Sequence, residues 1–156
     1  MTDTETLKQT FWKTLADSPF LFLQLDSNPH HAVVMTAQLD EDANSAIWFF
    51  TTRNHHLAQG GAATATFTGK GHDLFARFTG SLTAENDRTR IDQHWSPAVE
   101  AWYDQGKADP DMLLMRMDLG QAEIWQADTG LVETAKMLLG FDMPEEAAKK
   151  HVETSL

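Results

Sequence analysis

The chain has 156 residues, and 12 Lys and Arg against 23 Asp and Glu give it a formal net charge of −11. This length predicts a single domain over residues 1–156, and a hydrophobic content of 42% is too high for a disordered chain. The acidic balance argues against nucleic acid and against an anionic membrane surface as partners. The absence of Cys excludes disulfides, thiolate metal sites and a Cys nucleophile.

The first residues carry neither the basic segment nor the apolar run of a secretory signal. The longest early apolar stretch, residues 20–23, is far shorter than the roughly 20 residues that cross a membrane. We therefore expect a cytoplasmic protein with no membrane span.

The N-terminal segment predicts a helix over about residues 3–17. Thr2 and Glu5 have the spacing of a capping box, which satisfies free amides at a helix start. Helical spacing then gives one apolar face, formed by Leu7, Phe11 and Leu15.

Short runs of apolar and β-branched residues predict strands. The seven runs are 20–25, 31–39, 46–52, 62–68, 73–82, 112–119 and 121–127. Polar turns separate most of them, and Asp118-Leu119-Gly120 predicts a turn between the last two. A short helix is expected within residues 53–61.

Two further helical regions follow from the pattern. Residues 86–103 predict a helix that Pro97 divides, with one apolar stripe formed by Ile91, Trp95, Val99 and Trp102. A C-terminal helix is predicted over about 131–139, where Gly140 ends it. Short strands joined by hairpins predict a mainly β (α+β) antiparallel barrel with peripheral helices, not a parallel sheet.

Charge is unevenly distributed along the chain. Residues 53–84 contain Arg53, Lys70 and Arg77 but only one acid, Asp73, and they form the one net-basic stretch. If the protein binds an anion, this stretch is the expected site. The alternative is that the strands in this stretch simply contain few acidic residues.

The sequence lacks the common motifs of metal, nucleotide-phosphate and hydrolase sites. His30-His31 and His55-His56 are adjacent pairs, and neighbours on an extended strand point to opposite faces, so we expect no metal site. No glycine-rich phosphate loop and no GxSxG nucleophile elbow occurs. The five Trp ordinarily pack in the core or at an interface. Alternatively, some of them bind a planar, partly polar ligand.

Four blocks of sequence nevertheless resemble a known family in their order and spacing. They are VMTAQ at 34–38, IWFFTTR at 47–53, the stretch from Gly80 to Pro97, and the stretch from Ala101 to Trp125. The chain resembles the general stress protein branch of the pyridoxamine 5′-phosphate oxidase-like, FMN-binding split-barrel family. This resemblance implies a split β-barrel that forms a homodimer with flavin sites at the interface. It implies FMN as the cofactor, with FAD as the alternative flavin.

Carried over position by position, the resemblance implies a cofactor-binding set. The set is His31, Met35, Thr36, Phe50, Thr51, Thr52, Arg53, His56, Leu57 and Trp125. His31 and Thr36 stand where the oxidases have an Arg and a Lys, and His55-His56-Leu57 stands in place of Ser-Arg-Lys. Arg53 is then the expected phosphate ligand, because its guanidinium can make paired contacts to a phosphate.

The same resemblance places Trp125, within Glu-Ile-Trp-Gln, beside the flavin of the other subunit. The Arg-x-His substrate motif of the oxidases has no counterpart, so pyridoxine 5′-phosphate oxidation is not expected. No catalytic residue is evident, which leaves open whether the chain is a flavin-dependent oxidoreductase.

Three hypotheses follow for the function. The first is a homodimeric flavin-binding protein with a redox role. The second, motivated by the missing Arg and Lys, is a cofactor-free dimeric binding or interaction protein on the same barrel. The third is a carrier of apolar ligands. The substrate and the electron donor or acceptor do not follow from the sequence.

Overall fold

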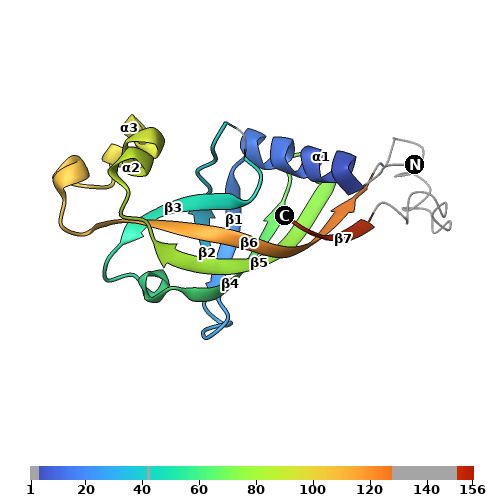
Figure 1. The fold of residues 1–156 in the computed structure, drawn as a ribbon, viewed down its shortest axis with the longest axis horizontal. Helices are drawn as coiled ribbons and strands as arrows, with labels where there is room; N and C mark the ends of the chain where they lie inside the picture. The colour runs from blue at the N-terminus through green and yellow to red at the C-terminus, as the bar shows by residue number, and fades with distance from the viewer. Residues whose placement is uncertain (1–3, 42, 128–150) are drawn as a thin grey trace.

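The computed structural model describes residues 4–41, 43–127 and 151–156. The helices in these residues are α1 (Thr4–Asp17), α2 (Arg88–His94) and α3 (Pro97–Glu100), with short 3-10 turns η1 (His56–Gln59) and η2 (Gly106–Ala108). The strands are β1 (Phe20–Leu25), β2 (Val33–Thr36), β3 (Ala46–Thr52), β4 (Gly61–Thr68), β5 (Leu74–Ala84), β6 (Met112–Gln126) and β7 (His151–Ser155). Figure 1 shows α2 and α3 grouped at one end of the sheet, with β7 toward the other.

The described strands form one antiparallel sheet of seven strands in the order β2-β1-β4-β5-β6-β3, with β7 also paired to β6. The predicted mainly β, antiparallel fold is therefore confirmed. β3 pairs with residues 112–118 of β6 and β7 with residues 121–125, so both lie along one edge of that strand.

The two ends of this strand order meet at one point. Gln38, just after β2, forms an isolated antiparallel bridge with Trp48 of β3. Its amide donates to the Trp48 carbonyl at 2.8 Å, and the Trp48 amide donates back at 3.0 Å. The sheet thus closes into a barrel at this bridge, while β2 and β3 make no continuous ladder beyond it.

The predicted N-terminal helix is present as α1, and its apolar face is confirmed. Leu7, Phe11 and Leu15 are all buried. Phe11 packs edge-on against Phe67 of β4 and Phe78 of β5, with ring centroids 6.2 and 5.5 Å apart. This helix therefore covers the barrel core. The predicted cap residue Thr2 lies outside the described residues.

A second, smaller core lies between the sheet and the helices α2 and α3. It consists of Ala46, Trp48, Ile91, Val99, Tyr103, Met112 and Leu114. Pro97 separates the two helices as predicted, with Ser96 as the N-cap of α3. The prediction that Trp102 lies on the buried stripe is wrong, because α3 ends at Glu100 and Trp102 is 84% exposed.

The prediction of two strands over 112–127 is also wrong. Residues 112–126 form the single strand β6. The backbone amide and carbonyl groups of the expected turn bond to other segments of the chain, which keeps these residues extended. The Leu119 amide donates to the Ser45 carbonyl, and the Gly120 carbonyl accepts from the Leu156 amide. The register with β5 shifts at this place, because Phe78 pairs with Ala122 and Gly80 with Leu119, which leaves residues 120–121 of β6 opposite one residue of β5.

The seventh strand is β7, which the sequence patterns did not predict. The predicted C-terminal helix at 131–139 lies outside the described residues. Within the described part of the chain, no helix is both long and apolar enough to cross a membrane.

Candidate functional site

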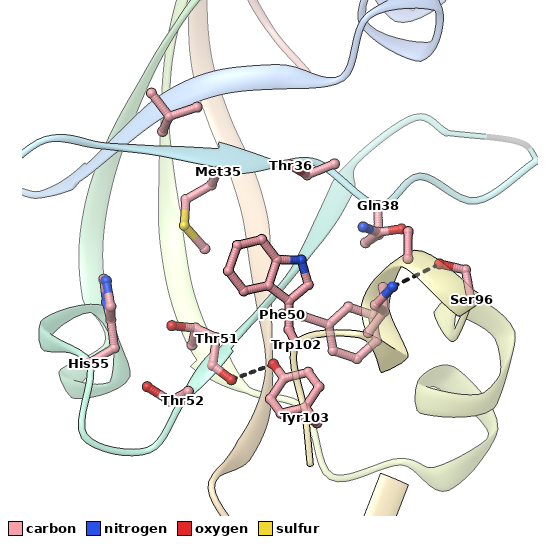
Figure 2. A pocket seen from close by; sticks show the side chains of 13 residues that line it. Met35, Thr36, Gln38, Phe50, Thr51, Thr52, His55, Ser96, Trp102 and Tyr103 are labelled. Carbon is pink, nitrogen blue, oxygen red and sulfur yellow. Dashed lines mark hydrogen bonds between the residues drawn. The ribbon is translucent and has the colours of Figure 1, made fainter. Parts of the chain in front are cut away.

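A cavity of about 560 Å³ opens where β2 and β3 diverge beyond the Gln38–Trp48 bridge. One wall comes from β2 and the residues after it, the second from β3 and its following turn, and the third from α3 and the turn after it (Figure 2). The lining residues are Val34, Met35, Thr36, Gln38, Phe50, Thr51, Thr52, His55, Ser96, Ala98, Val99, Trp102 and Tyr103.

The only titratable side chains in the lining of the cavity are those of His55 and Tyr103. The lining combines aromatic rings and a thioether with hydroxyl and amide groups, and it contains no Asp, Glu, Lys or Arg. Pockets that hold small ligands span about 300–1,000 Å³ and have this mainly apolar character with a few polar groups. Such a surface suits a planar heteroaromatic ligand with polar substituents.

Tyr103 fixes the floor of the cavity. Its hydroxyl donates a 2.6 Å hydrogen bond to the Thr51 carbonyl (Figure 2). Its ring stacks on Trp95, with centroids 5.8 Å apart. Burial, reinforced by the nearby Asp109 carboxylate, raises the pKa of Tyr103 to about 12. The phenol is therefore a hydrogen-bond donor at neutral pH and does not act as a base.

His55 lies at the start of η1, at one side of the cavity (Figure 2). Its Nδ1 accepts a 3.2 Å hydrogen bond from the Leu57 amide and thereby caps that turn. Burial lowers the pKa of His55, and the nearby rings of His56 and His31 lower it further. The ring is thus held neutral with its proton on Nε2.

The structure brings five of the ten predicted cofactor residues to this cavity. They are Met35, Thr36, Phe50, Thr51 and Thr52. Two more, His31 and His56, lie next to it, because the ring of His56 stacks between those of His31 and His55 at 3.9 and 4.4 Å.

Arg53 is exposed and does not line the cavity. Its amide donates to the Asp111 carbonyl and its Nε to the Pro110 carbonyl, both at 2.9 Å. These bonds fix the arginine against the loop before β6. Its two terminal nitrogens have no hydrogen-bond partner within the described residues.

Leu57 and Trp125 lie elsewhere. The Leu57 side chain is 1% exposed and packs in the main core, so it does not reach the cavity. Trp125 is near the far end of β6, 38% exposed, and its ring stacks on His151 with centroids 5.1 Å apart. Within one chain, neither residue contacts a ligand in this cavity.

The α3 wall was absent from the predicted site. Ser96, Trp102 and Tyr103 lie in stretches that resemble the family, and Val99 lies between two of them, but the resemblance assigned none of the four a role. The pair Trp102-Tyr103 was the available signal, because two adjacent aromatic residues after a short helix cannot both enter one core.

Residues 6–142 match the protein-family model described as pyridoxamine 5′-phosphate oxidase like. The chain belongs to the pyridoxamine 5′-phosphate oxidase-like family. No match is found among curated proteins.

Solved structures of this family resemble the chain along most of its length. A general stress family protein from Xanthomonas campestris pv. campestris is 40% identical, with 84% of this chain and 94% of that chain covered and a TM-score of 0.76. The general stress FMN/FAD binding protein of Xanthomonas citri is 41% identical, with coverages of 82% and 94% and a TM-score of 0.76. A general stress protein 26 from Jannaschia sp. CCS1 is 28% identical, with coverages of 99% and 100% and a TM-score of 0.82.

Proposed function

We propose that this protein binds a flavin, FMN in preference to FAD, in the cavity between β2 and β3. The observation that carries the proposal is the cavity itself, about 560 Å³ of mixed aromatic and hydroxyl surface at the point where the barrel splits. The Xanthomonas citri relative, described as an FMN/FAD binding protein and 41% identical, supports the same ligand class.

The lining fits the flavin ring system. Phe50 and Met35 offer apolar surface for a tricyclic ring, and polar groups such as Gln38 and the Thr51 hydroxyl offer partners for its edge. β2 pairs only with β1 in this region of the described sheet, which leaves its other edge free for backbone hydrogen bonds to a ligand.

A flavin would supply hydride or electron transfer, which a chain without Cys cannot supply alone. The role of the residues is then to bind and orient. Tyr103 holds the Thr51 backbone in place, and α3 excludes water from one side of the cavity. We propose a redox role on this basis, and the cavity presents no carboxylate to serve as a general base.

An FMN titration tests the proposal directly. Absorption and flavin fluorescence of the purified protein should report one bound FMN per chain with a dissociation constant at or below the low micromolar range. No binding at high micromolar FMN would overturn the proposal. Parallel titration with FAD decides between the two flavins.

Substitution of Arg53 distinguishes the flavin-binding proposal from the hypothesis of a cofactor-free protein. Its terminal nitrogens have no partner within the described residues and are suited to a phosphate. Arg53→Ala should therefore weaken FMN binding about tenfold or more, in the range of a lost charged hydrogen bond. Arg88→Ala, at the exposed start of α2, is the matched control and should bind like the native protein. Equal affinities would show that the phosphate does not sit at Arg53.

We further propose that the protein is a homodimer. Phe20 and Phe22 of β1 and Val34 of β2 are 57%, 51% and 60% exposed, and the register places Phe22 directly opposite Val34. Val34 also lines the cavity, so a second copy on this face would cover both. In the family resemblance it is this second copy that brings Trp125 to the flavin.

Sedimentation velocity tests the dimer. The native protein should sediment as a dimer at micromolar concentration, and Phe22→Ser should raise the dissociation constant by about tenfold or more. A native protein that stays monomeric throughout this range would contradict the proposal.

A further inference from the structure

Among the five Trp of the chain, Trp102 alone contacts no other ring and no cation within the described residues. The other four each stack on another aromatic ring or meet one edge-on; they are Trp12, Trp48, Trp95 and Trp125. Trp102 also belongs to neither hydrophobic core and is 84% exposed. A Trp buries about 150–250 Å² when it finds a partner, so an unpartnered indole beside a cavity is a candidate binding surface.

The backbone that carries this indole is fixed, whereas the ring itself is free. The Trp102 amide donates to the Val99 carbonyl at 3.0 Å, and the hydroxyl of the next residue, Tyr103, is anchored on the Thr51 carbonyl. Figure 2 shows the indole extending from the turn after α3 toward the side of the cavity that β2 forms. Because the ring lines the cavity and is nevertheless mostly exposed, it stands at the mouth and not at the floor. Ordering it on a ligand restricts only two side-chain torsions.

The chemistry around Trp102 selects an uncharged, planar ligand. The lining of the cavity contains no Asp, Glu, Lys or Arg, so no fixed charge there compensates a charged molecule for its lost hydration. The indole is electron-rich and stacks most favourably on a flat, electron-poor ring. Its Nε1–H has no acceptor within the described residues and can donate to a carbonyl oxygen of the ligand. A quinone combines these three properties.

We propose that Trp102 forms the outer side of a second binding site, which takes a planar, uncharged and electron-poor aromatic substrate of the quinone class. This inference rests on the proposed flavin function and adds the substrate class. A flavin on the strand side of the cavity, against Phe50 and Met35, leaves its outer face toward the mouth. The substrate then lies between that face and the Trp102 ring. The exposed apolar face proposed for the dimer lies on β1 and β2, so it does not account for this ring on the α3 side.

Fluorine NMR of the FMN-loaded protein, labelled with fluorotryptophan, tests contact with the indole directly. Menadione, a methyl naphthoquinone, serves as the probe, and the chain has no Cys with which it could form an adduct. The signal that disappears in Trp102→Phe belongs to Trp102. This signal should shift as menadione is added, and a Trp102 signal that does not move at saturating menadione would overturn the inference.

Affinities then measure what the ring contributes. Trp102→Ala should raise the menadione dissociation constant about tenfold, in the range of a lost aromatic stack, and Trp102→Phe should restore part of the affinity. Trp12→Phe, a substitution on α1 that keeps a ring against Phe11, is the control and should bind menadione like the native protein. Decalone, a saturated bicyclic ketone of similar size, should bind at least tenfold more weakly than menadione. Equal menadione affinity in the native protein and Trp102→Ala, or equal affinity for decalone and menadione, contradicts a stacking site.

The same variants separate this inference from the two proposals above. The FMN affinity and the dimer dissociation constant of Trp102→Ala should each stay within about twofold of the native values. If FMN affinity falls as much as menadione affinity, the ring belongs to the flavin site, and if dimerisation weakens instead, it belongs to the subunit contact; either result overturns the inference. If the native protein binds no FMN, the proposed function fails, and the menadione titrations of the ligand-free native protein and Trp102→Ala decide the inference alone.

Discussion

Tyr103 links the second core to the cavity through a single hydrogen bond. Its hydroxyl satisfies the carbonyl of Thr51, a residue only 8% exposed, at the end of β3. Thr51 is also paired with Leu113 in the β3–β6 ladder, so the Tyr103 hydroxyl adds a second contact at this position, and such a hydrogen bond contributes about 0.5–1.5 kcal/mol. The same bond holds the β3 wall of the cavity at a fixed distance from α3.

Tyr103→Phe should lower the free energy of unfolding by about 0.5–1.5 kcal/mol, since it removes one buried hydrogen bond while retaining the ring stack on Trp95. Urea unfolding followed by tryptophan fluorescence measures this change. Thr52→Val is the control, because the Thr52 hydroxyl bonds only to the exposed Asn54 side chain, and its loss should cost less. Equal stability of Tyr103→Phe and the native protein would contradict the expected role.

His94 is the buried histidine of the second core. It is 6% exposed, stacks on Trp48 with centroids 5.0 Å apart, and has Nε2 3.2 Å from the Asp40 carboxylate without a well-aligned hydrogen bond. Burial lowers the pKa of His94, and the Arg90 charge adds to this, although Asp40 opposes both. The folded protein therefore favours the neutral ring.

A depressed histidine pKa makes the folded state less stable in acid. Below the unfolded pKa of about 6.5 the unfolded chain binds more protons than the folded one, so stability declines as the pH falls from 7 toward 5. His94→Phe keeps a ring on Trp48 and removes the titration. The free energy of unfolding should fall less between pH 7 and pH 5 in this variant than in the native protein, as urea unfolding at each pH would show. Parallel declines would assign the acid sensitivity to other groups.

At the scale of the elements, the pairing of β5 with β6 requires a glycine at position 80. The register shifts between Phe78 and Gly80, and a methyl group on Gly80 would collide with the Asp118 carbonyl and lie 3.1 Å from the Met117 side chain. The Asp118 oxygen belongs to the backbone of a paired strand and cannot rotate away. The close approach of the two strands therefore requires a residue without a side chain.

Gly80→Ala should lower the free energy of unfolding by about 1–3 kcal/mol, the usual cost of overpacking. Gly120→Ala is the matched control in the paired strand. A methyl group there would lie 3.5 Å from the nearest Thr79 atoms, an ordinary contact, so it should cost less. Thermal unfolding by circular dichroism compares the two, and a smaller cost at Gly80 than at Gly120 would contradict this account.

Elements with a strong local pattern could be predicted from the sequence. α1 followed from the spacing of Leu7, Phe11 and Leu15, and β1 and β3 have the predicted bounds. The continuity of β6 could not be predicted, because Gly120 is a turn signal locally and only distant partners, Ser45 and Leu156, keep it extended. Local chemistry does not report the partners that a residue meets through the fold.

The cavity shows the same limit. Thr51 and Met35 were expected at the site from the family resemblance, whereas Ser96 and Tyr103 lie far along the chain and reach it only because α3 packs on the second core. Periodicity indicates which face of an element is buried. It does not indicate which buried faces leave a gap between them.

For the molecule as a whole, the net charge of −11 acts on the proposed dimer. Two such chains repel each other in dilute buffer, and salt screens this repulsion over roughly 10 Å at 0.1 M. The exposed Phe22 and Val34 contribute apolar contacts that do not depend on screening. Association should therefore respond to salt in the direction opposite to that of a complex held by ion pairs.

Raising the NaCl concentration from about 20 to about 200 mM should tighten self-association severalfold, because the Debye length falls below the size of the interface. Sedimentation equilibrium at both salt concentrations measures the change. Weaker association at higher salt would show that attractive ion pairs, and not the apolar face, dominate the contact.

β6 also constrains how the protein is made. This strand is the partner of β3, β5 and β7, yet it begins only at Met112. Until β6 has emerged from the ribosome, the edges of β3 and β5 that pair with it are unpaired. Residues such as Phe49 and Phe78, which are buried in the folded protein, then remain exposed. The nascent chain therefore carries open strand edges for most of its synthesis, which is the stage at which a chaperone would protect it from aggregation.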